Sequence, residues 1–222
     1  MKLSVTPIAM TQPLVSFIPD GEGLMAYCAR VSNPSNQNNF ETADGLLKYC
    51  AKHGHWSVFE MVNVVLEIKA ARDISRQILR HKSAAFQEFS QRYADVTEDM
   101  FTFREMRMQD DKNRQNSIAV DEHHEWSNEW YKDQLKLIEL EKEIVSKWRE
   151  RGVAKECTRV FWSEGLTMSS MYVNMNVRTL AHWLKVRTGN GTQKEHILVA
   201  QAALNACEPL FPQSWSALVG EQ

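Results

Sequence analysis

The sequence predicts an α+β (mixed α/β) single domain with a central, mostly antiparallel sheet flanked by helices, plus a long helical segment. Three observations support this class. Segments with apolar residues at helical spacing alternate with short β-branched runs. One polar stretch, residues 121–151, keeps helical character for far longer than an ordinary helix. The length of 222 residues suits one fairly large domain that needs no metal or disulfide to fold.

The N-terminal half alternates the two kinds of element. Runs with partial period-two alternation predict strands at residues 1–10 and 61–69. Helical spacing predicts helices at residues 23–31 and 41–53, separated by the polar loop 32–39. Asp73 is expected to cap a short helix that ends near His81. Residues 82–93 have no clear period, so we expect a loop there.

The C-terminal half is mainly helical. The segment from Asp121 to Arg151 is acidic at its start and basic at its end, the charge order that the helix dipole favours. A strand is expected at residues 166–175. Helical patterns cover three further segments, residues 153–163, 176–187 and 192–208. Pro209 and Pro212 should stop the last helix.

Composition narrows the class of protein. The chain holds 26 Lys and Arg against 28 Asp and Glu, a net charge of −2, which argues against a generally basic nucleic-acid binder. It has no apolar run long enough to span a membrane and no apolar core of signal-peptide type near residue 1. Its four cysteines form no CxxC pair and are expected to be reduced and mostly buried. We therefore expect a cytoplasmic protein without nucleic-acid or membrane partners.

The densest group of functional side chains lies between residues 72 and 92. Five cations stand there against two acids, and Arg76 and Arg80 share one helix face while Gln77 and His81 share the neighbouring face. Forked guanidinium groups suit phosphate and other planar anions. The segment is therefore a candidate anion site, although a solvated basic helix followed by an ordinary polar loop would explain the charges as well.

A second basic group comes near the C-terminus. It consists of Asn176, Arg178, His182, Lys185 and Arg187, which fall on adjoining turns of one predicted helix. Apolar residues between them would anchor that helix to the core. A helix whose basic face is merely solvated is the alternative interpretation.

Several catalytic classes find no support in the sequence. There is no G-x-S-x-G elbow, no G-x-G-x-x-G fingerprint and no G-x4-G-K-[ST] loop, and no cysteine sits in an electropositive motif. Cys50, His53 and His55, with Glu60 nearby, offer zinc-ligand types, but their spacing is irregular. We expect no metal site, and we keep zinc-dependent hydrolysis as a minor alternative.

Five segments in order resemble the flavin-dependent thymidylate synthases. Arg80-His81-Lys82, followed by Ser90-Gln91-Arg92-Tyr93, resembles the family signature R-H-R, seven residues, S-x-R-Y. His55 to Glu60 resembles its H-x-S/T-x-x-E segment, and Ala29 to Ser32 its A-R-V-S turn. Asn176 to Arg187 resembles the helix N-x-R-x-L…L-x-x-R, and Gln193-Lys194-Glu195 the Q-x-E that opens the last helix. The resemblance covers roughly residues 5–212.

The resemblance implies a methyltransferase that converts dUMP to dTMP. Methylenetetrahydrofolate would donate the carbon, NADPH would be the reductant, and FAD would mediate hydride transfer. It also implies a homotetramer with active sites built from several subunits. The uracil chemistry would need no protein nucleophile, because the cofactor carries the difficult step.

Residue by residue, the resemblance implies two binding sets. Those assigned to dUMP are Gln77, Arg80, Glu88, Ser90, Arg92 and Arg187, of which Arg187 would be catalytic by stabilising negative charge on the uracil ring. Those assigned to FAD are Ser32, Ser57, Glu60, Arg80, His81, Lys82, Ser83, Gln87, Asn176 and His182. His81 and Lys82 are expected to supply positive charge to the flavin pyrophosphate.

Some positions depart from the family pattern. Lys82 stands where the signature has a second arginine, and a point charge there replaces a fork. Gly191 stands where many members have a histidine, and Gln87 replaces a more usual asparagine. The alternative function is therefore a catalytically inactive nucleotide- or RNA-binding protein on the same fold. Residues 99–130 look like a polar insertion, to which the sequence assigns no role.

Overall fold

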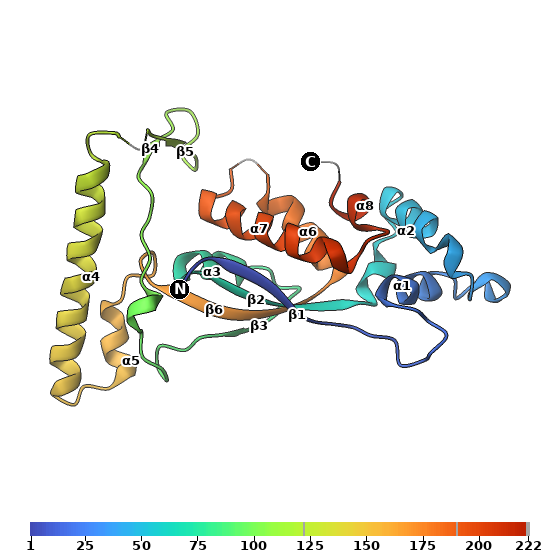
Figure 1. Cartoon of the computed structure of the whole chain (residues 1–222), viewed down its shortest axis with the longest axis horizontal. Helices are drawn as coiled ribbons and strands as arrows, with labels where there is room; N and C mark the ends of the chain where they lie inside the picture. The colour runs from blue at the N-terminus through green and yellow to red at the C-terminus, as the bar shows by residue number, and fades with distance from the viewer. Residues whose placement is uncertain (122, 190, 221–222) are drawn as a thin grey trace.

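The computed structural model describes residues 1–121, 123–189 and 191–220. Its centre is a four-stranded sheet in the order β1-β2-β6-β3, with every neighbouring pair antiparallel (Figure 1). The strands are β1 Ser4–Met10, β2 Asn63–Ala71, β6 Met168–Asn176 and β3 Ala85–Glu88. The predicted α+β domain with an antiparallel sheet is thus confirmed.

One face of the sheet carries the core. Alternate residues of β2 (Val64, Leu66 and Ile68) are fully buried, because side chains of a strand point to opposite faces in turn. Helices α6 Val177–Arg187 and α7 Lys194–Cys207 cover this face (Figure 1). The opposite face is half-exposed and polar, with Glu67 paired across to Tyr172. The apolar side of the sheet therefore fixes where α6 and α7 lie.

The remaining elements gather at the two ends of the sheet (Figure 1). Helices α1 Gly21–Ala29, α2 Ala43–Lys52 and α8 Trp215–Val219 lie at one end, with 3-10 turns at Pro34–Asn36, Phe40–Thr42 and Trp56–Glu60. The long helix α4 Ser127–Glu150 and the short α5 Lys155–Thr158 lie at the other end. Three 3-10 turns complete the described chain, at Glu98–Met100, Arg159–Phe161 and Glu208–Leu210.

Helix α3 Arg72–Ile78 follows β2 directly and corrects one prediction. Its N-cap residue is Ala71, so Asp73 is not the cap but the second residue of the helix. The Asp73 carboxylate instead accepts two hydrogen bonds from Arg104 Nη2, each 3.0 Å. The Asp73 carboxylate thus binds Arg104, 31 residues away in the sequence, rather than capping the helix.

Two other predictions are wrong in detail, and the structure adds elements that were not predicted. Residues 82–93 are not all loop, since β3 pairs with β6 along the sheet edge. The long helix begins at Ser127 rather than Asp121, and Glu122 lies outside the described residues. Within 99–130 there is a hairpin, β4 Arg107–Gln109 with β5 Ser117–Ala119, and helix α8 was not predicted. Elements of three to five residues carry too little periodicity to be seen in sequence.

All four cysteines are free thiols, as expected. Cys50 and Cys207 are buried, whereas Cys28 is partly exposed and Cys157 is exposed. Two of the four cysteines are therefore buried, fewer than expected. Of the helices in the described ranges, none combines the length and apolar character that a membrane-crossing segment needs.

Candidate functional site

The largest cavity near the predicted residues lies beside α6 and has a volume of about 1220 Å³. Four residues of the predicted flavin set line it, namely Glu60, Ser83, Asn176 and His182. Trp56 and the C-terminal residues 217–220 supply further walls. Segments from the middle and the end of the chain thus converge on one cavity.

The N-terminus of α6 is fixed by Asn176. Its side-chain oxygen accepts the backbone N–H of Thr179 at 2.8 Å, which satisfies one of the free donors of the first turn. Arg178 follows in that turn and pairs with Glu60 at 2.5 Å. His182 and Lys185 are exposed on later turns of the same helix. The cavity wall is therefore polar and rich in hydrogen-bond donors.

Arg187 ends α6 and meets His81. Its Nε donates a hydrogen bond to His81 Nε2 over 3.2 Å. Burial, and then the charges of Arg187 and His182, lower the pKa of His81 to about 4. His81 is consequently neutral at pH 7 and accepts a hydrogen bond from Arg187. In the structure the His81 ring holds Arg187, and its contact with a flavin pyrophosphate stays a prediction.

Gln77 lies beside residues far along the chain. Its Nε2 donates to Gln193 Oε1 over 2.7 Å, and its Oε1 is 3.1 Å from Nδ1 of the buried His196. Gln193 in turn donates to Glu195 over 3.0 Å. Both polar atoms of the Gln77 amide thus contact the start of α7, one through His196 and the other through the N-cap residue Gln193.

Glu88 is bound within an ion-pair cluster. Its Oε1 accepts from Ser169 at 2.8 Å and lies 3.6 Å from Arg72, and its Oε2 accepts from Arg76 at 3.0 Å. Burial lowers the pKa of Arg72, and Glu88 opposes that shift. Most of the hydrogen-bonding capacity of Glu88 is already used inside the chain.

Ser90 and Arg92 lie in a different place from Arg187. They line a shallow pocket of about 460 Å³ with Lys155 and Glu156, and Arg92 pairs with Glu156 at 3.2 Å. Neither residue lines the large cavity beside α6. One chain therefore does not bring all the residues of the predicted dUMP set into one cavity.

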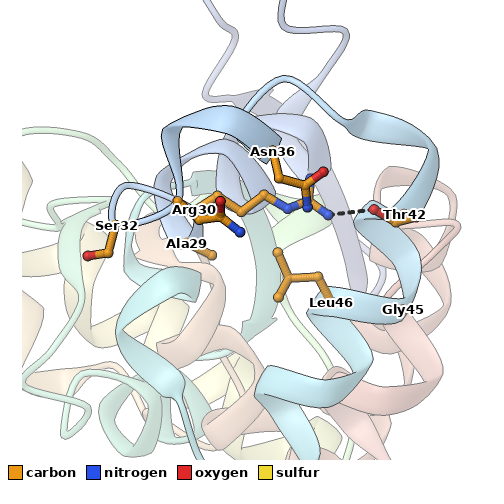
Figure 2. A pocket seen from close by; sticks show the side chains of 8 residues that line it. Ala29, Arg30, Ser32, Asn36, Thr42, Gly45 and Leu46 are labelled. Atoms are coloured by element: carbon orange, nitrogen blue, oxygen red, sulfur yellow. Dashed lines mark hydrogen bonds between the residues drawn. The ribbon is translucent and has the colours of Figure 1, made fainter.

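Ser32 lines a third pocket, of about 500 Å³, between α1 and α2 (Figure 2). Arg30 crosses this pocket and donates to Thr42 Oγ1 over 2.7 Å and to the carbonyl of Asn39. The guanidinium thus ties together the loop between the helices. It also explains why the A-R-V-S segment has an arginine that is almost wholly buried.

A family model described as thymidylate synthase complementing protein matches residues 13–213 of the chain. This chain belongs to that family. The resemblance stated from the sequence is confirmed.

Two relatives support the membership over nearly the whole length. A probable flavin-dependent thymidylate synthase of Paramecium bursaria Chlorella virus 1 is 44% identical over 218 residues, covering 97% of each chain. The flavin-dependent thymidylate synthase of Synechocystis sp. is 40% identical over 222 residues, covering 97% of this chain and 99% of the relative. The chain spans 97% and 99% of the length of these two relatives.

The fold matches a solved structure. A UMP/dUMP methylase from Streptomyces cacaoi, bound with 5-Br dUMP, superposes with a TM-score of 0.81 at 23% identity, covering 97% of this chain and 94% of that one. At this identity the likeness shows a shared fold.

Some residues of the thymidylate synthase signature do not line the large cavity. Ser57 is exposed on the 3-10 turn Trp56–Glu60, Arg80 and Lys82 are exposed after the end of α3, and Gln87 is exposed on β3. Gly191, a departure from the family pattern, has φ of +84°. That conformation strains any residue with a Cβ, so a histidine would fit this turn poorly.

Sequence reasoning missed three residues that touch the site. His196 was detectable as a lone polar residue on the apolar face of α7, one turn before Val199 and Ala200. Arg104 and Arg107 had no signal, because they come from the 99–130 segment and reach Glu195 only in the folded chain, over 2.7 to 3.2 Å. That segment therefore touches the site through Glu195.

The zinc alternative disagrees with the structure. Cys50 is buried in the core, where burial raises the pKa of its thiol, whereas His53 and His55 are exposed and pack around Tyr49. Within the described ranges, no three metal-ligating side chains converge.

Proposed function

We propose that this chain is a flavin-dependent thymidylate synthase that converts dUMP to dTMP. Methylenetetrahydrofolate is the carbon donor and NADPH the reductant. The single observation that carries the proposal is 40 to 44% identity to flavin-dependent thymidylate synthases across 97% of the chain. Identity over nearly the whole length, with Arg80, His81, Ser90 and Arg92 of the signature in place, favours an active enzyme over an inactive nucleotide- or RNA-binding protein.

The cavity beside α6 fits a dinucleotide such as FAD. Its volume of about 1220 Å³ exceeds the roughly 300–1,000 Å³ of most small-molecule pockets. Its donors suit a pyrophosphate, since Arg178 and Lys185 carry positive charge and Thr188 and Gln201 add polar contacts. When bound, FAD supplies the hydride chemistry that amino-acid side chains lack.

We assign further residues of the FAD set by the family pattern. Glu60, Ser83, Asn176 and His182 would contact the cofactor inside this cavity. Residues outside it (Ser32, Ser57, Arg80, His81, Lys82 and Gln87) would reach FAD from neighbouring subunits or from the cavity rim.

The dUMP set divides into two parts. Gln77, Arg80 and Arg187 would hold the uracil, with the donor and acceptor of the Gln77 amide facing its imide edge. Ser90 and Arg92, with Glu88 behind them, would hold the phosphate and sugar. Arg187 would stabilise negative charge on the ring, and neutral His81 holds its guanidinium in place.

This division supports a shared active site. We propose a homotetramer in which Ser90 and Arg92 of one subunit complete the uracil site of another, because these two residues line a pocket to which none of Gln77, Arg80 and Arg187 contributes. The whole chain would form one synthase domain with 99–130 as an insertion. Its four free thiols suit the reducing cytoplasm.

The test is purification, a visible spectrum and an activity assay. We expect flavin absorption bands after addition of FAD, and release of tritium from C5-labelled dUMP that requires both the folate and NADPH. Uptake of FAD and dUMP without tritium release would favour the inactive binding protein, and failure to bind either would refute the family function for this chain.

A further inference from the structure

A directional chain of hydrogen bonds holds the side-chain amide of Gln77. Trp183 Nε1 donates to Nε2 of His196 over 3.3 Å, and Nδ1 of His196 is 3.1 Å from Gln77 Oε1. Gln77 Nε2 donates to Gln193 Oε1 over 2.7 Å, and Gln193 Nε2 donates to Glu195 Oε2 over 3.0 Å. His196 has no solvent exposure, so water does not compete for these contacts at its end.

The residue at each end of this series of hydrogen bonds can act in only one way, either as a donor or as an acceptor. The indole of Trp183 can only donate, so Nε2 of His196 must be an acceptor. Burial, followed by the nearby charge of Arg187, lowers the pKa of His196 to about 3, so its ring is neutral. The single proton therefore sits on Nδ1 and is donated to Gln77 Oε1.

Glu195 fixes the other end, because an ionised carboxylate only accepts. Gln193 must turn its N–H group toward Glu195 and its oxygen toward Gln77. Arg104 and Arg107 hold Glu195 at 2.7 to 3.2 Å, and they help to lower its pKa against the opposing effect of burial. The 99–130 segment thus anchors this end.

The two ends select the same orientation of the Gln77 amide. A half-turn would set its N–H group against the N–H of His196 and its oxygen against the oxygen of Gln193. Both hydrogen bonds would be replaced by repulsive contacts. One N–H and one lone pair of Gln77 remain unused, in a fixed order.

That order distinguishes two kinds of pyrimidine. Uracil presents an N–H at N3 beside an oxygen at C4, whereas cytosine presents a bare nitrogen at N3 beside an amino group at C4. A freely turning glutamine amide could pair with either edge, whereas a fixed one pairs with only one of them.

We propose that His196 is a positioning residue that locks Gln77 so that the site takes a 4-oxo pyrimidine nucleotide and rejects its 4-amino counterpart. This inference rests on the proposed function, which sets Gln77 against the uracil edge. A cytosine ring would set its amino group against the N–H group of the locked amide and its N3 lone pair against the amide oxygen. Such a mismatch of donors and acceptors greatly weakens binding.

The test is calorimetric titration of the FAD-loaded protein with dUMP and with dCMP. Wild type is expected to prefer dUMP by at least about tenfold. His196→Leu removes one of the two contacts that orient Gln77 and leaves its amide held through Gln193 alone, which should lower this preference about tenfold. His196→Asn is the matched control, because its amide N–H can take the place of Nδ1 and should restore most of the preference. A general loss of packing would weaken both nucleotides equally in both variants.

Each result decides something. If wild type binds no dUMP, the proposed function and this inference both fail. If wild type prefers dUMP and the folded Leu variant keeps the same preference, this inference fails while the function stands. If the Leu variant does not fold, nitrogen NMR of ¹⁵N-histidine-labelled wild type decides, since a proton on Nε2 of His196 would overturn the proposal and one on Nδ1 would support it.

Discussion

Arg187 ends a helix, where the partial negative charge of the C-terminal carbonyl groups favours a cation. Burial, followed by the charge of Arg80, lowers the pKa of Arg187, yet a guanidinium remains protonated at any pH the fold survives. Its Nε is held by a neutral histidine, which accepts a hydrogen bond without cancelling the charge. The guanidinium therefore keeps its full positive charge while His81 holds its Nε.

We expect Arg187→Ala to lower kcat/KM by roughly 10²- to 10³-fold, the usual effect of removing one preorganised charge-stabilising donor. The fold should persist, because the side chain is only partly buried. Tritium release measures the first effect and thermal unfolding the second. Lys132→Ala, on the exposed surface of α4, is the control and should match wild type in both. Near-normal turnover in the arginine variant would refute the catalytic role.

The buried histidines make stability depend on pH. The pKa of His196 falls to about 3 in the folded state from about 6.5 when unfolded, so the unfolded chain binds more protons between these values. The stabilising contribution is complete above pH 6.5 and is lost as the pH falls toward 3. We expect His196 to cost roughly 1.5 kcal/mol of unfolding free energy between pH 6.5 and 5.

Urea denaturation at a series of pH values measures this dependence. His196→Asn should show a shallower slope over that range, whatever its stability at pH 7. Equal slopes for the variant and wild type would mean that His196 titrates normally in the folded chain.

At the scale of elements, helix α6 organises the site. It carries Arg178, His182, Lys185 and Arg187, and its start is fixed by the Asn176 cap. The sequence predicted this helix well, because its buried residues Val177, Leu180, Trp183 and Leu184 follow helical spacing. It did not predict β3, whose four residues become a strand only by pairing with β6.

Asn176→Ala is expected to lower the unfolding free energy by about 1 kcal/mol, the ordinary value of an N-cap side chain. Asn176→Asp keeps the accepting oxygen and should remain within a few tenths of a kcal/mol of wild type. Chemical denaturation of the three proteins measures the difference. An alanine variant as stable as the aspartate variant would show that the cap contributes nothing.

At the scale of the whole molecule, the site residues are spread over the chain. The predicted dUMP contacts Ser90 and Arg92 line one pocket, and α6 lines another. We therefore expect a complete dUMP site to form only when a second copy is placed against the first.

Complementation tests this arrangement. Arg92→Ala and Arg187→Ala subunits should each be nearly inactive, and tetramers reassembled from a mixture should regain up to about one quarter of wild-type turnover, because some sites then receive both arginines. A mixture of Arg187→Ala with Lys132→Ala, which supplies intact sites, calibrates the exchange of subunits. Reassembled mixed tetramers without regained activity would show that each site is built within one subunit.

The sequence by itself determined the α+β class, the order of the main strands and helices, the family and the basic side chains of α6. These properties depend on local spacing and on motifs whose residues lie close together in the chain. Only the tertiary structure showed that Gln77 meets Gln193 and His196, more than 110 residues away, and that Arg104 and Arg107 hold Glu195. Periodicity records which face of an element is buried, whereas the partner of a buried polar atom depends on how distant elements pack together.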